Sequence, residues 1–222
     1  SIGGKNGIDV GEYKNMVGVI RQPSFLYYDS NFLSTLPRQE WVNGFAEIIK
    51  HGAVLDAKLF KQLSAISLKD LKEDKKLLTV IIRRNVELKS SVVKQDEFEQ
   101  GDRKLLNFGH TLGHALETQY ELTHGQAVAL GMVFAAWLSE RLLGFKHAAT
   151  VEQVLMQYGL PTRSVFDVDR VFEILKMDKK RANKNMRFVL LSKLGKGQIV
   201  EIPLTTLKKQ LVVFNTLNKQ QQ

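Results

Sequence analysis

The sequence predicts a mainly α-helical domain with a β-hairpin, preceded by the end of an α/β unit. Three observations predict this fold. The first thirty residues combine scattered glycines with short β-prone runs. From Ser34 onward, apolar residues recur at the period of a helix. Near the C-terminus, two β-prone runs flank a glycine-bearing turn. We therefore expect an α/β remnant at residues 1–30 and a helical domain at residues 31–222.

The elements follow from local patterns taken in chain order. An extended run covers Met16–Ile20, and a β-prone run covers Phe25–Tyr28 after Pro23. Pro37 predicts the start of a helix that continues past Trp41. Further helices are predicted over Ala57–Ser64, Asp70–Val93, Thr111–Tyr120, Gly125–Leu143, Ala148–Tyr158 and Asp169–Met177. The predicted hairpin joins Arg187–Ser192 to Gln198–Ile202 through Gly195 and Gly197, and we expect a frayed tail over Asn218–Gln222.

Composition limits the possible classes of protein. A chain of 222 residues with 44% hydrophobic and 25% charged residues is typical of a globular fold. Without cysteine, any metal must be held by nitrogen and oxygen, and a cytoplasmic location is expected. The longest uncharged run, Gly125–Ser139, is shorter than the roughly 20 residues that cross a bilayer, which predicts a buried core helix and no membrane partner. The start at Ser1, with neither initiator methionine nor leader, indicates a piece of a longer chain.

The net charge of +9 predicts an anionic partner. Most basic residues are interspersed with acidic ones, as in Lys69–Lys76, and the dense group at Lys179–Arg181 has no interleaved aromatics. We therefore expect a small anionic substrate and no nucleic acid. Neither GxGxxG nor GxxxxGK[ST] occurs, so this chain by itself does not contain a complete nucleotide site.

The motif Asn107–His114, NFGHTLGH, is the first candidate for chemistry. On a helix, His110 and His114 share one face and can reach one metal ion or one substrate, and His124 follows closely. From spacing alone, a metal or catalytic site and ordinary helix histidines remain open alternatives. A second cluster, Glu47 with Lys50 and His51, lies among apolar residues. A partly buried Glu47 needs a partner, which is either Lys50 or a metal.

Two basic groups are more ambiguous. Lys89, Arg103 and Asn107 form either a solvated helix end or a clamp for a carboxylate or phosphate. Lys5, Lys14 and Asn15 allow the same two interpretations.

These motifs together resemble one family, the 3-dehydroquinate synthases. The resemblance covers nearly the whole chain but lacks the family's N-terminal nucleotide-binding half. It implies the dehydroquinate synthase-like helical C-terminal fold. It is carried by GGKNGI from Gly3, GFAEIIKHG from Gly44, Lys89, DE at Asp96, GDR from Gly101, LNFGHTLGH from Leu106, HG at His124 and DKK from Asp178.

The resemblance implies roles for individual residues. The implied zinc ligands, with cobalt as an alternative metal, are Glu47, His110 and His124, while His114 is a catalytic residue that faces the substrate. The implied substrate contacts are Lys50, Lys89, Arg103, Asn107 and a lysine of Asp178–Lys180. The implied NAD site and domain interface include Lys5, Lys14, Asn15, Phe32, Leu33, Ser34 and Thr35.

The implied reaction converts a seven-carbon keto-acid phosphate to 3-dehydroquinate and phosphate, through transient oxidation by NAD, in the shikimate pathway. The full-length enzyme is expected to be a homodimer, and this chain alone is expected to be inactive. Gln126 stands where the family usually has glutamate, which predicts weaker orientation of the metal ligands or a lower metal affinity. The loop from Glu117 to His124 is also short for the family.

Three alternatives remain at the level of sequence. The first is another sugar-phosphate cyclase, which makes an inosose or a valiolone. The second is a metal-dependent polyol or alcohol dehydrogenase of the same fold. The third is a non-catalytic helical domain whose basic face around Lys179–Arg187 binds acidic partners.

Overall fold

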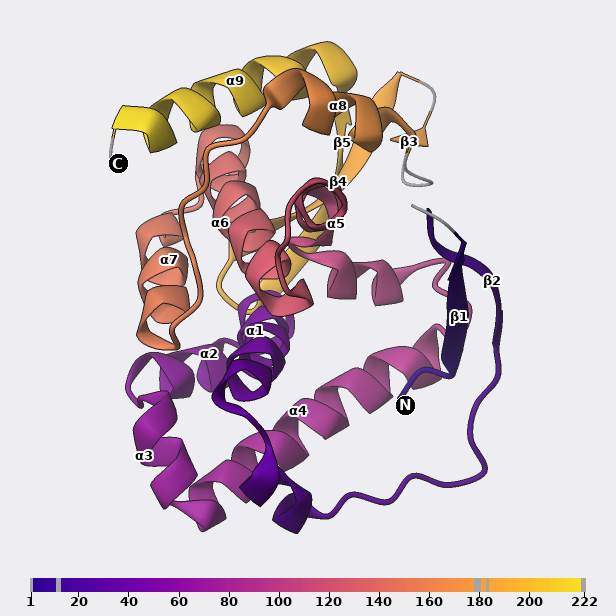
Figure 1. The fold of residues 1–222 in the computed structure, drawn as a ribbon, viewed down its shortest axis with the longest axis vertical. Helices are drawn as coiled ribbons and strands as arrows, with labels where there is room; N and C mark the ends of the chain where they lie inside the picture. Colours follow the sequence, from indigo (N-terminus) through magenta and orange to yellow (C-terminus); the bar gives the residue numbers. More distant parts are fainter. Residues whose placement is uncertain (1, 11–12, 178–180, 183, 221–222) are drawn as a thin grey trace. The chain divides into compact units, whose positions relative to one another are not determined.

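The protein folds into two compact units. The computed structural model describes residues 2–10, 13–177, 181–182 and 184–220. Unit 1 comprises Ser1–Pro37 and Lys69–Lys104, and unit 2 comprises Arg38–Leu68 and Leu105–Gln222 (Figure 1). The chain passes between the units after Pro37, at the start of α3 (Leu68–Glu73) and within η2 (Asp102–Asn107).

Unit 1 contains a two-stranded antiparallel sheet and a long helix. Its elements are β1 (Lys5–Val10), β2 (Tyr13–Ile20), η1 (Ser30–Thr35) and α4 (Lys75–Gln95). Glycine is required at position 18, because a Cβ there would lie 2.0 Å from the Asn6 carbonyl oxygen on the paired strand. The predicted extended run at Met16–Ile20 is confirmed as part of β2.

The β-prone run Phe25–Tyr28 is not a strand, so that expectation is wrong. Phe25 and Tyr27 are 82% and 79% exposed, and the described sheet of unit 1 pairs β1 with β2 alone. A strand needs a neighbouring strand for its backbone hydrogen bonds, so β-propensity alone does not form one.

Unit 2 is built around α6 (His124–Leu143), which contacts α1, α5, α7 and β4. Its remaining elements are α1 (Arg38–Leu55), α2 (Ala57–Ser64), α5 (His110–Gln119), α7 (Ala148–Gln157), α8 (Val168–Met177), β3 (Arg181–Ala182), β4 (Asn185–Lys193), β5 (Lys196–Pro203) and α9 (Leu204–Gln220). Although α6 is long and apolar enough to cross a membrane, 67% of its apolar window is buried inside the protein. The prediction of a buried core helix is confirmed.

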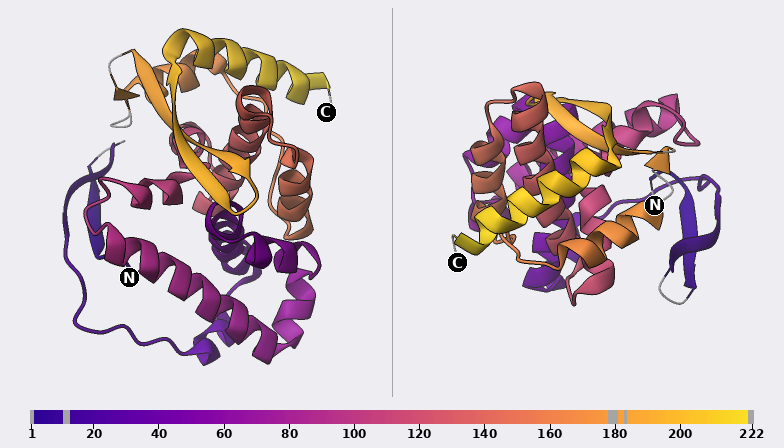
Figure 2. Two further views of the ribbon diagram at one scale, coloured as in Figure 1. Left: turned by 180° about the vertical axis from the view of Figure 1, so that it is seen from behind. Right: turned by 90° about the horizontal axis from the view of Figure 1, so that it is seen from above.

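The hairpin β4–β5 is also confirmed and is anchored to the helices of unit 2 (Figure 2). The buried Ser139 hydroxyl of α6 accepts a hydrogen bond from the Leu191 N–H of β4 at 2.8 Å. At the turn, the Gly195 N–H donates to the Ala53 carbonyl of α1 at 2.8 Å, with φ of 74° in the left-handed region. These bonds attach the hairpin to α6 and α1.

Most predicted helices agree with the observed ones to within one or two residues, but two predictions are wrong. The helix predicted over Asp70–Val93 is interrupted, because the Asp74 carboxylate accepts a hydrogen bond from the Leu77 N–H and caps a new helix, α4. The expectation of a frayed tail from Asn218 onward is also wrong, because the helix α9 continues through Gln220. The Asn218 side chain is buried and donates to the Ser164 carbonyl at 2.9 Å.

Candidate metal centre

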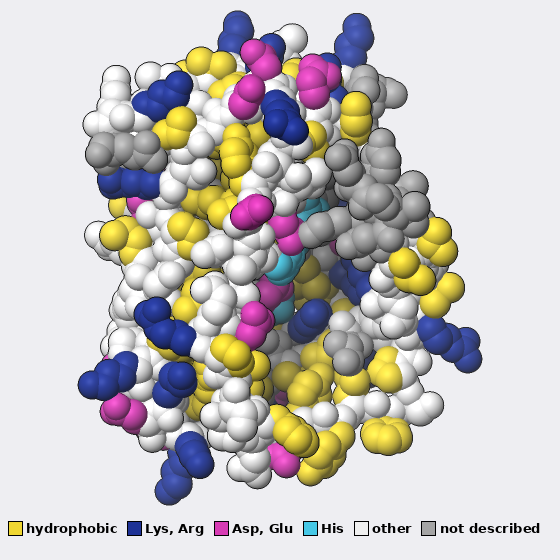
Figure 3. Space-filling model, in the orientation of Figure 1, with side chains coloured by type: hydrophobic (Ala, Val, Ile, Leu, Met, Phe, Trp, Pro, Cys, Tyr) yellow, Lys and Arg dark blue, Asp and Glu magenta, His cyan; other side chains and the backbone are white. Residues whose placement is uncertain are grey.

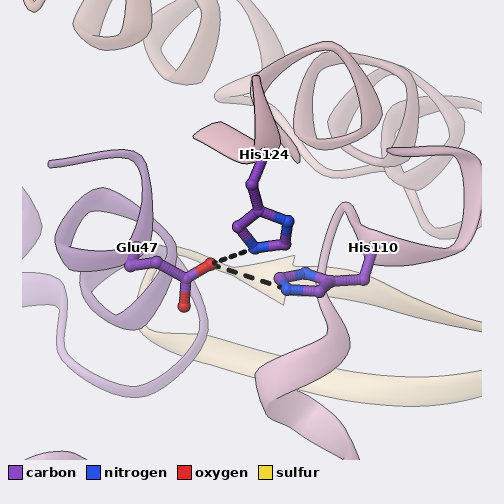
Figure 4. Close-up of side chains that lie close together, drawn as sticks. All are labelled: Glu47, His110 and His124. Atoms are coloured by element: carbon purple, nitrogen blue, oxygen red, sulfur yellow. Dashed lines mark ion pairs between the residues drawn. The ribbon is translucent and has the colours of Figure 1, made fainter. Parts of the chain in front are cut away.

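Three helices of unit 2 bring one carboxylate and two imidazoles together (Figure 4). Glu47 lies in the middle of α1, His110 is the first residue of α5, and His124 is the first residue of α6. Glu47 Oε1 lies 3.5 Å from His110 Nε2 and 3.6 Å from His124 Nε2. The three candidate ligand atoms all lie within 4.8 Å of one another.

The start of α6 is held against α1 one turn before Glu47. The Thr123 hydroxyl donates to Asn43 Oδ1 at 2.7 Å. A Cβ on Gly125 would lie 2.5 Å from the Asn43 Cα, so only glycine permits this close approach. These contacts place His124 beside the helix that carries Glu47.

Gln126 completes a capping box at the start of α6. Its side-chain oxygen accepts a hydrogen bond from the Thr123 N–H at 2.9 Å. A neutral amide makes this bond as a carboxylate would. Gln126 thus contacts the helix cap in the structure, whereas the sequence suggested a role in orienting a metal ligand.

His110 is oriented by the backbone in front of α5. Gly109 has φ of 80°, and the His110 Nδ1 lies 3.2 Å from the Phe108 carbonyl oxygen. The ring is 12% exposed. Because a carbonyl only accepts, this contact favours a proton on Nδ1 and leaves Nε2 directed toward Glu47.

His124 has a second carboxylate on its other side. Its Nδ1 lies 3.4 Å from Glu117 Oε2, and the Glu117 side chain is 11% exposed. Glu117 is not among the site residues predicted from the sequence. The available signal was the spacing of three between His114 and Glu117, which puts both on one face of α5.

The surroundings of the centre shift the pKa values of His110 and His124 in opposite directions. Burial and the Lys50 ammonium lower the pKa of His110 well below its ordinary value. The Glu117 and Glu47 carboxylates raise the pKa of His124 to about 9. Burial opposes ionisation of Glu47, but Lys50 and the two imidazoles outweigh it and hold the pKa of Glu47 well below its ordinary value. The centre therefore presents an ionised carboxylate to cations.

The donor set fits a divalent metal ion. Glu47 Oε1 is buried, has no hydrogen-bond partner among the described residues, and lies close to the Nε2 atoms of both histidines. One carboxylate oxygen and two imidazole nitrogens are ligands that zinc and cobalt accept, and three protein ligands leave a coordination position for substrate. On the side of the molecule drawn in Figure 3, histidine side chains are visible at the surface next to acidic ones.

Lys50 and His114 border the centre. The buried Lys50 ammonium donates to Glu47 Oε2 at 2.6 Å. The His114 ring centroid lies 5.2 Å from that of His110 and 6.3 Å from that of His124. His51 of the same sequence cluster is buried in α1 and does not belong to either candidate group of ligand atoms among the described residues.

The other predicted residues lie elsewhere in the chain. Asn107 ends η2, three residues before His110. Lys89 on α4, Lys5 on β1 and η1 with Phe32, Leu33, Ser34 and Thr35 belong to unit 1, as do Lys14 and Asn15 on β2. Lys5 forms an ion pair with Glu99. Asp178, Lys179 and Lys180 lie outside the described residues.

Arg103 is buried in unit 1 and held by the backbone. Its guanidinium donates to the Gly3 carbonyl at 2.8 Å and to the Glu97 carbonyl. The adjoining loop is organised by Asp96, whose carboxylate accepts from the N–H groups of Gln100 at 2.8 Å, of Gly101 at 2.8 Å and of Arg103 at 3.0 Å. Asp96 thus determines the path of the backbone into Arg103.

This loop predicts an acid-dependent loss of stability. Desolvation opposes ionisation of Asp96, but the three N–H donors outweigh it and lower the pKa of Asp96 below its ordinary value of 3.8. The ionised carboxylate therefore contributes stability above pH 3.8 that is lost as the pH falls through the lowered pKa. We expect Asp96→Asn to unfold at lower urea than wild type at neutral pH, with a difference that shrinks in acid. An NMR titration in which the Gly101 amide shifts at or above pH 3.8 would contradict the assignment.

Family models match the chain on both sides of Gly44. Residues 44–181 match the model described as 3-dehydroquinate synthase C-terminal, and residues 1–43 match the model described as 3-dehydroquinate synthase N-terminal. The chain is 41% identical over 210 residues to the 3-dehydroquinate synthase of Geobacillus thermodenitrificans, covering 91% of this chain and 57% of that protein. The corresponding values for Bacillus cytotoxicus are 40%, 224 residues, 96% and 59%. The chain thus spans less than two thirds of these relatives.

Solved structures show the same fold. A 2-deoxy-scyllo-inosose synthase complexed with carbaglucose-6-phosphate, NAD+ and Co2+ aligns with a TM-score of 0.76 and 26% identity, covering 94% of this chain and 61% of that chain. The 2-epi-5-epi-valiolone synthase of Streptomyces hygroscopicus subsp. jinggangensis, with NAD+ and Zn2+ bound, aligns with 0.81 and 25%, covering 97% and 62%. Because the first family model covers more than half of the sequence, the chain belongs to the 3-dehydroquinate synthase family.

Proposed function

We propose that this chain is the metal- and substrate-binding portion of a 3-dehydroquinate synthase. The whole enzyme converts 3-deoxy-D-arabino-heptulosonate 7-phosphate to 3-dehydroquinate and phosphate in the shikimate pathway. The observation that carries the proposal is the convergence of Glu47, His110 and His124 on one point in a chain that matches this family. The lack of cysteine agrees with a cytoplasmic enzyme.

Glu47, His110 and His124 are the residues that would hold the metal, which we propose to be zinc, with cobalt as a substitute. The two structural relatives bind Co2+ and Zn2+, respectively. When bound, such an ion polarises a substrate oxygen and lowers the pKa of a hydroxyl group. Lys50 holds Glu47 Oε2, so that Oε1 of the same carboxylate faces the two imidazoles.

The remaining groups suit a substrate that carries a carboxylate and a phosphate. His114 lies on the same helix as His110, one turn further on, and we propose that its imidazole holds or moves a proton of the substrate. Lys50, Lys89, Arg103 and Asn107 are the proposed contacts for the anionic groups. Arg103 is suited to this task because two backbone carbonyls keep its guanidinium in one orientation.

NAD is the proposed second cofactor, as in both structural relatives. The sequence contains no glycine-rich phosphate-binding motif, so its residues 1–30, with Lys5, Lys14 and Asn15, would form one side of such a site. The segment at Phe32–Thr35 would lie at the boundary. We propose that the rest of the site, and the surface that makes a homodimer, belong to the portion of the longer protein that this chain does not include.

The proposal predicts phosphate release from a completed enzyme. We would join this chain to the portion of the Geobacillus thermodenitrificans relative that precedes the matched region. With zinc, NAD and the heptulosonate phosphate, phosphate and 3-dehydroquinate are expected in equal amounts, without net NADH, because the oxidation is later reversed. His110→Ala in the same protein is expected to remove this activity.

Other outcomes would identify a different function. Turnover of a neutral sugar phosphate in place of the acid indicates a different cyclase, and accumulation of NADH indicates a dehydrogenase. Zinc binding by the chain alone is measured in parallel. If the chain binds zinc but the joined protein is inactive on every substrate, the joined protein has failed to assemble; if the joined protein turns over another substrate, the proposed function is wrong.

A further inference from the structure

The imidazole of His124 lies between two carboxylates on different helices. Its Nε2 lies 3.6 Å from Glu47 Oε1, and its Nδ1 lies 3.4 Å from Glu117 Oε2. Glu117 is nearly buried on α5, whereas the His124 side chain is 47% exposed. Each nitrogen of this exposed ring therefore has a separate acidic neighbour.

His110 has the same arrangement with a different acceptor. Its Nε2 also faces Glu47 Oε1, but its Nδ1 faces the Phe108 carbonyl, only two residues away in the chain. In metal sites, an acceptor on one imidazole nitrogen fixes the tautomer and directs the other nitrogen to the metal. For His110 the backbone supplies this acceptor, and for His124 the acceptor beside Nδ1 is the Glu117 carboxylate.

We infer that Glu117 is a positioning residue that accepts the Nδ1 proton of His124 and directs Nε2 of that imidazole to the metal. The inference rests on the proposed metal site. The ring of His124 needs such support because it is the first residue of α6 and about half of it is exposed, so burial does not hold it in one rotamer. A carboxylate acceptor also makes the imidazole a more basic ligand.

The position of Glu117 also bears on whether Gln126 weakens the support of the metal ligands. The sequence suggested that the missing carboxylate at position 126 weakens the support of the metal ligands. In the structure, Gln126 bonds to the Thr123 N–H at the helix cap, and the carboxylate beside His124 is Glu117. The glutamine that this chain has at position 126, in place of the family's usual glutamate, therefore leaves the support of His124 in place.

One competing geometry involves the same residues. Candidate ligand atoms of His114, Glu117 and His124 also lie within 4.8 Å of one another. If Glu117 were itself a ligand, the metal would lie on the Nδ1 side of His124, and Glu47 would be dispensable. Two imidazole Nε2 atoms from different helices converge on the buried Glu47 Oε1, which has no hydrogen-bond partner among the described residues, and this convergence favours the Glu47 side.

The test is zinc affinity of this chain, measured by competition with a chromophoric chelator, for wild type and four variants. Glu117→Ala is expected to weaken zinc binding about 10–100-fold while one equivalent still binds, and Glu117→Gln, which keeps a neutral acceptor, about tenfold or less. Glu121→Ala removes an exposed acid from the loop between Glu117 and His124 and controls for charge; it is expected to bind as wild type. Glu47→Gln is expected to remove binding.

A second readout reports ligand orientation directly. In the cobalt-loaded chain, the visible absorption bands are expected to shift and broaden in Glu117→Ala but not in Glu121→Ala, because a loosely held His124 changes the ligand field. In the zinc-loaded chain, nitrogen-15 NMR is expected to show His124 protonated at Nδ1.

The outcomes distinguish the proposed metal site from the positioning role of Glu117. Wild type that fails to bind zinc overturns the proposed metal site itself. Wild type that binds zinc, with unchanged affinity and cobalt spectrum in Glu117→Ala, overturns the positioning role alone. Binding lost in Glu117→Gln but retained in Glu47→Gln overturns it in favour of Glu117 as a ligand.

Discussion

Replacement of Glu47 by glutamine is expected to remove bound zinc from this chain. The side-chain amide is a poor metal ligand, and it withdraws the negative charge that lies beside His110 and His124. It also leaves the buried Lys50 ammonium without its carboxylate. We therefore expect a loss of stability of about 2–3 kcal/mol, less than for a fully buried pair because the Glu47 side chain is 30% exposed.

A double variant separates the loss of a ligand from damage to the fold. In Glu47→Gln combined with Lys50→Met, the unpaired ammonium is gone, so most of the lost stability is expected to return. Zinc binding is not expected to return. Elemental analysis after dialysis and urea unfolding measure the two effects. Zinc retained at one equivalent in either variant would exclude Glu47 as a ligand.

Replacement of Gly131 by alanine is expected to destabilise unit 2 strongly. A Cβ at Gly131 on α6 would lie 1.8 Å from the Gly109 carbonyl oxygen and 2.9 Å from the Gly113 N. Both are backbone atoms, so the start of α5 must move away from α6. Such overpacking costs about 3 kcal/mol or more. Because His110 begins α5, zinc affinity is expected to fall as well.

Gly44→Ala is the matched control. Gly44 lies in α1, and a Cβ there would meet nothing within 4 Å. Alanine at such a helical position is expected to raise stability by up to about 1 kcal/mol. Urea unfolding of the two variants measures the difference. Equal stability of Gly131→Ala and Gly44→Ala would show that the α5–α6 contact is not as close as the structure has it.

Local sequence patterns predicted the helices well where one face is continuously apolar. The segment Gly125–Leu143 carries no charge before Glu140, and α6 differs from it by a single residue. The patterns failed where a polar side chain decides the outcome. Asp74 interrupts a periodic segment by capping α4. No helix was predicted over Leu204–Gln220, and the expected fraying of Asn218–Gln222 begins inside the helix α9. In the structure, Asn215 and Asn218 bind the carbonyls of Phe166 and Ser164, which lie far away in the chain.

The candidate metal centre was likewise predicted from the sequence only in part. Spacing pointed to His110 and His114 as a pair, and the resemblance to the family implied Glu47, His110 and His124 as ligands. The structure places the latter three around one point and leaves His114 beside them. Their identity as ligands stays a proposal that the zinc measurements test. Glu117 received no role from the sequence, because its contact with His124 joins two helices.

By itself, the sequence determined the fold class, the family and the residue types from which a metal centre can be built. Only the tertiary structure decided that Glu47 Oε1 faces two imidazoles, that Glu117 stands behind His124 and that Gln126 caps a helix. The physical reason is the distance along the chain over which each kind of interaction acts. Periodicity and caps depend on neighbours within one or two turns, whereas these contacts depend on how closely α1, α5 and α6 pack, which glycines at 125 and 131 permit.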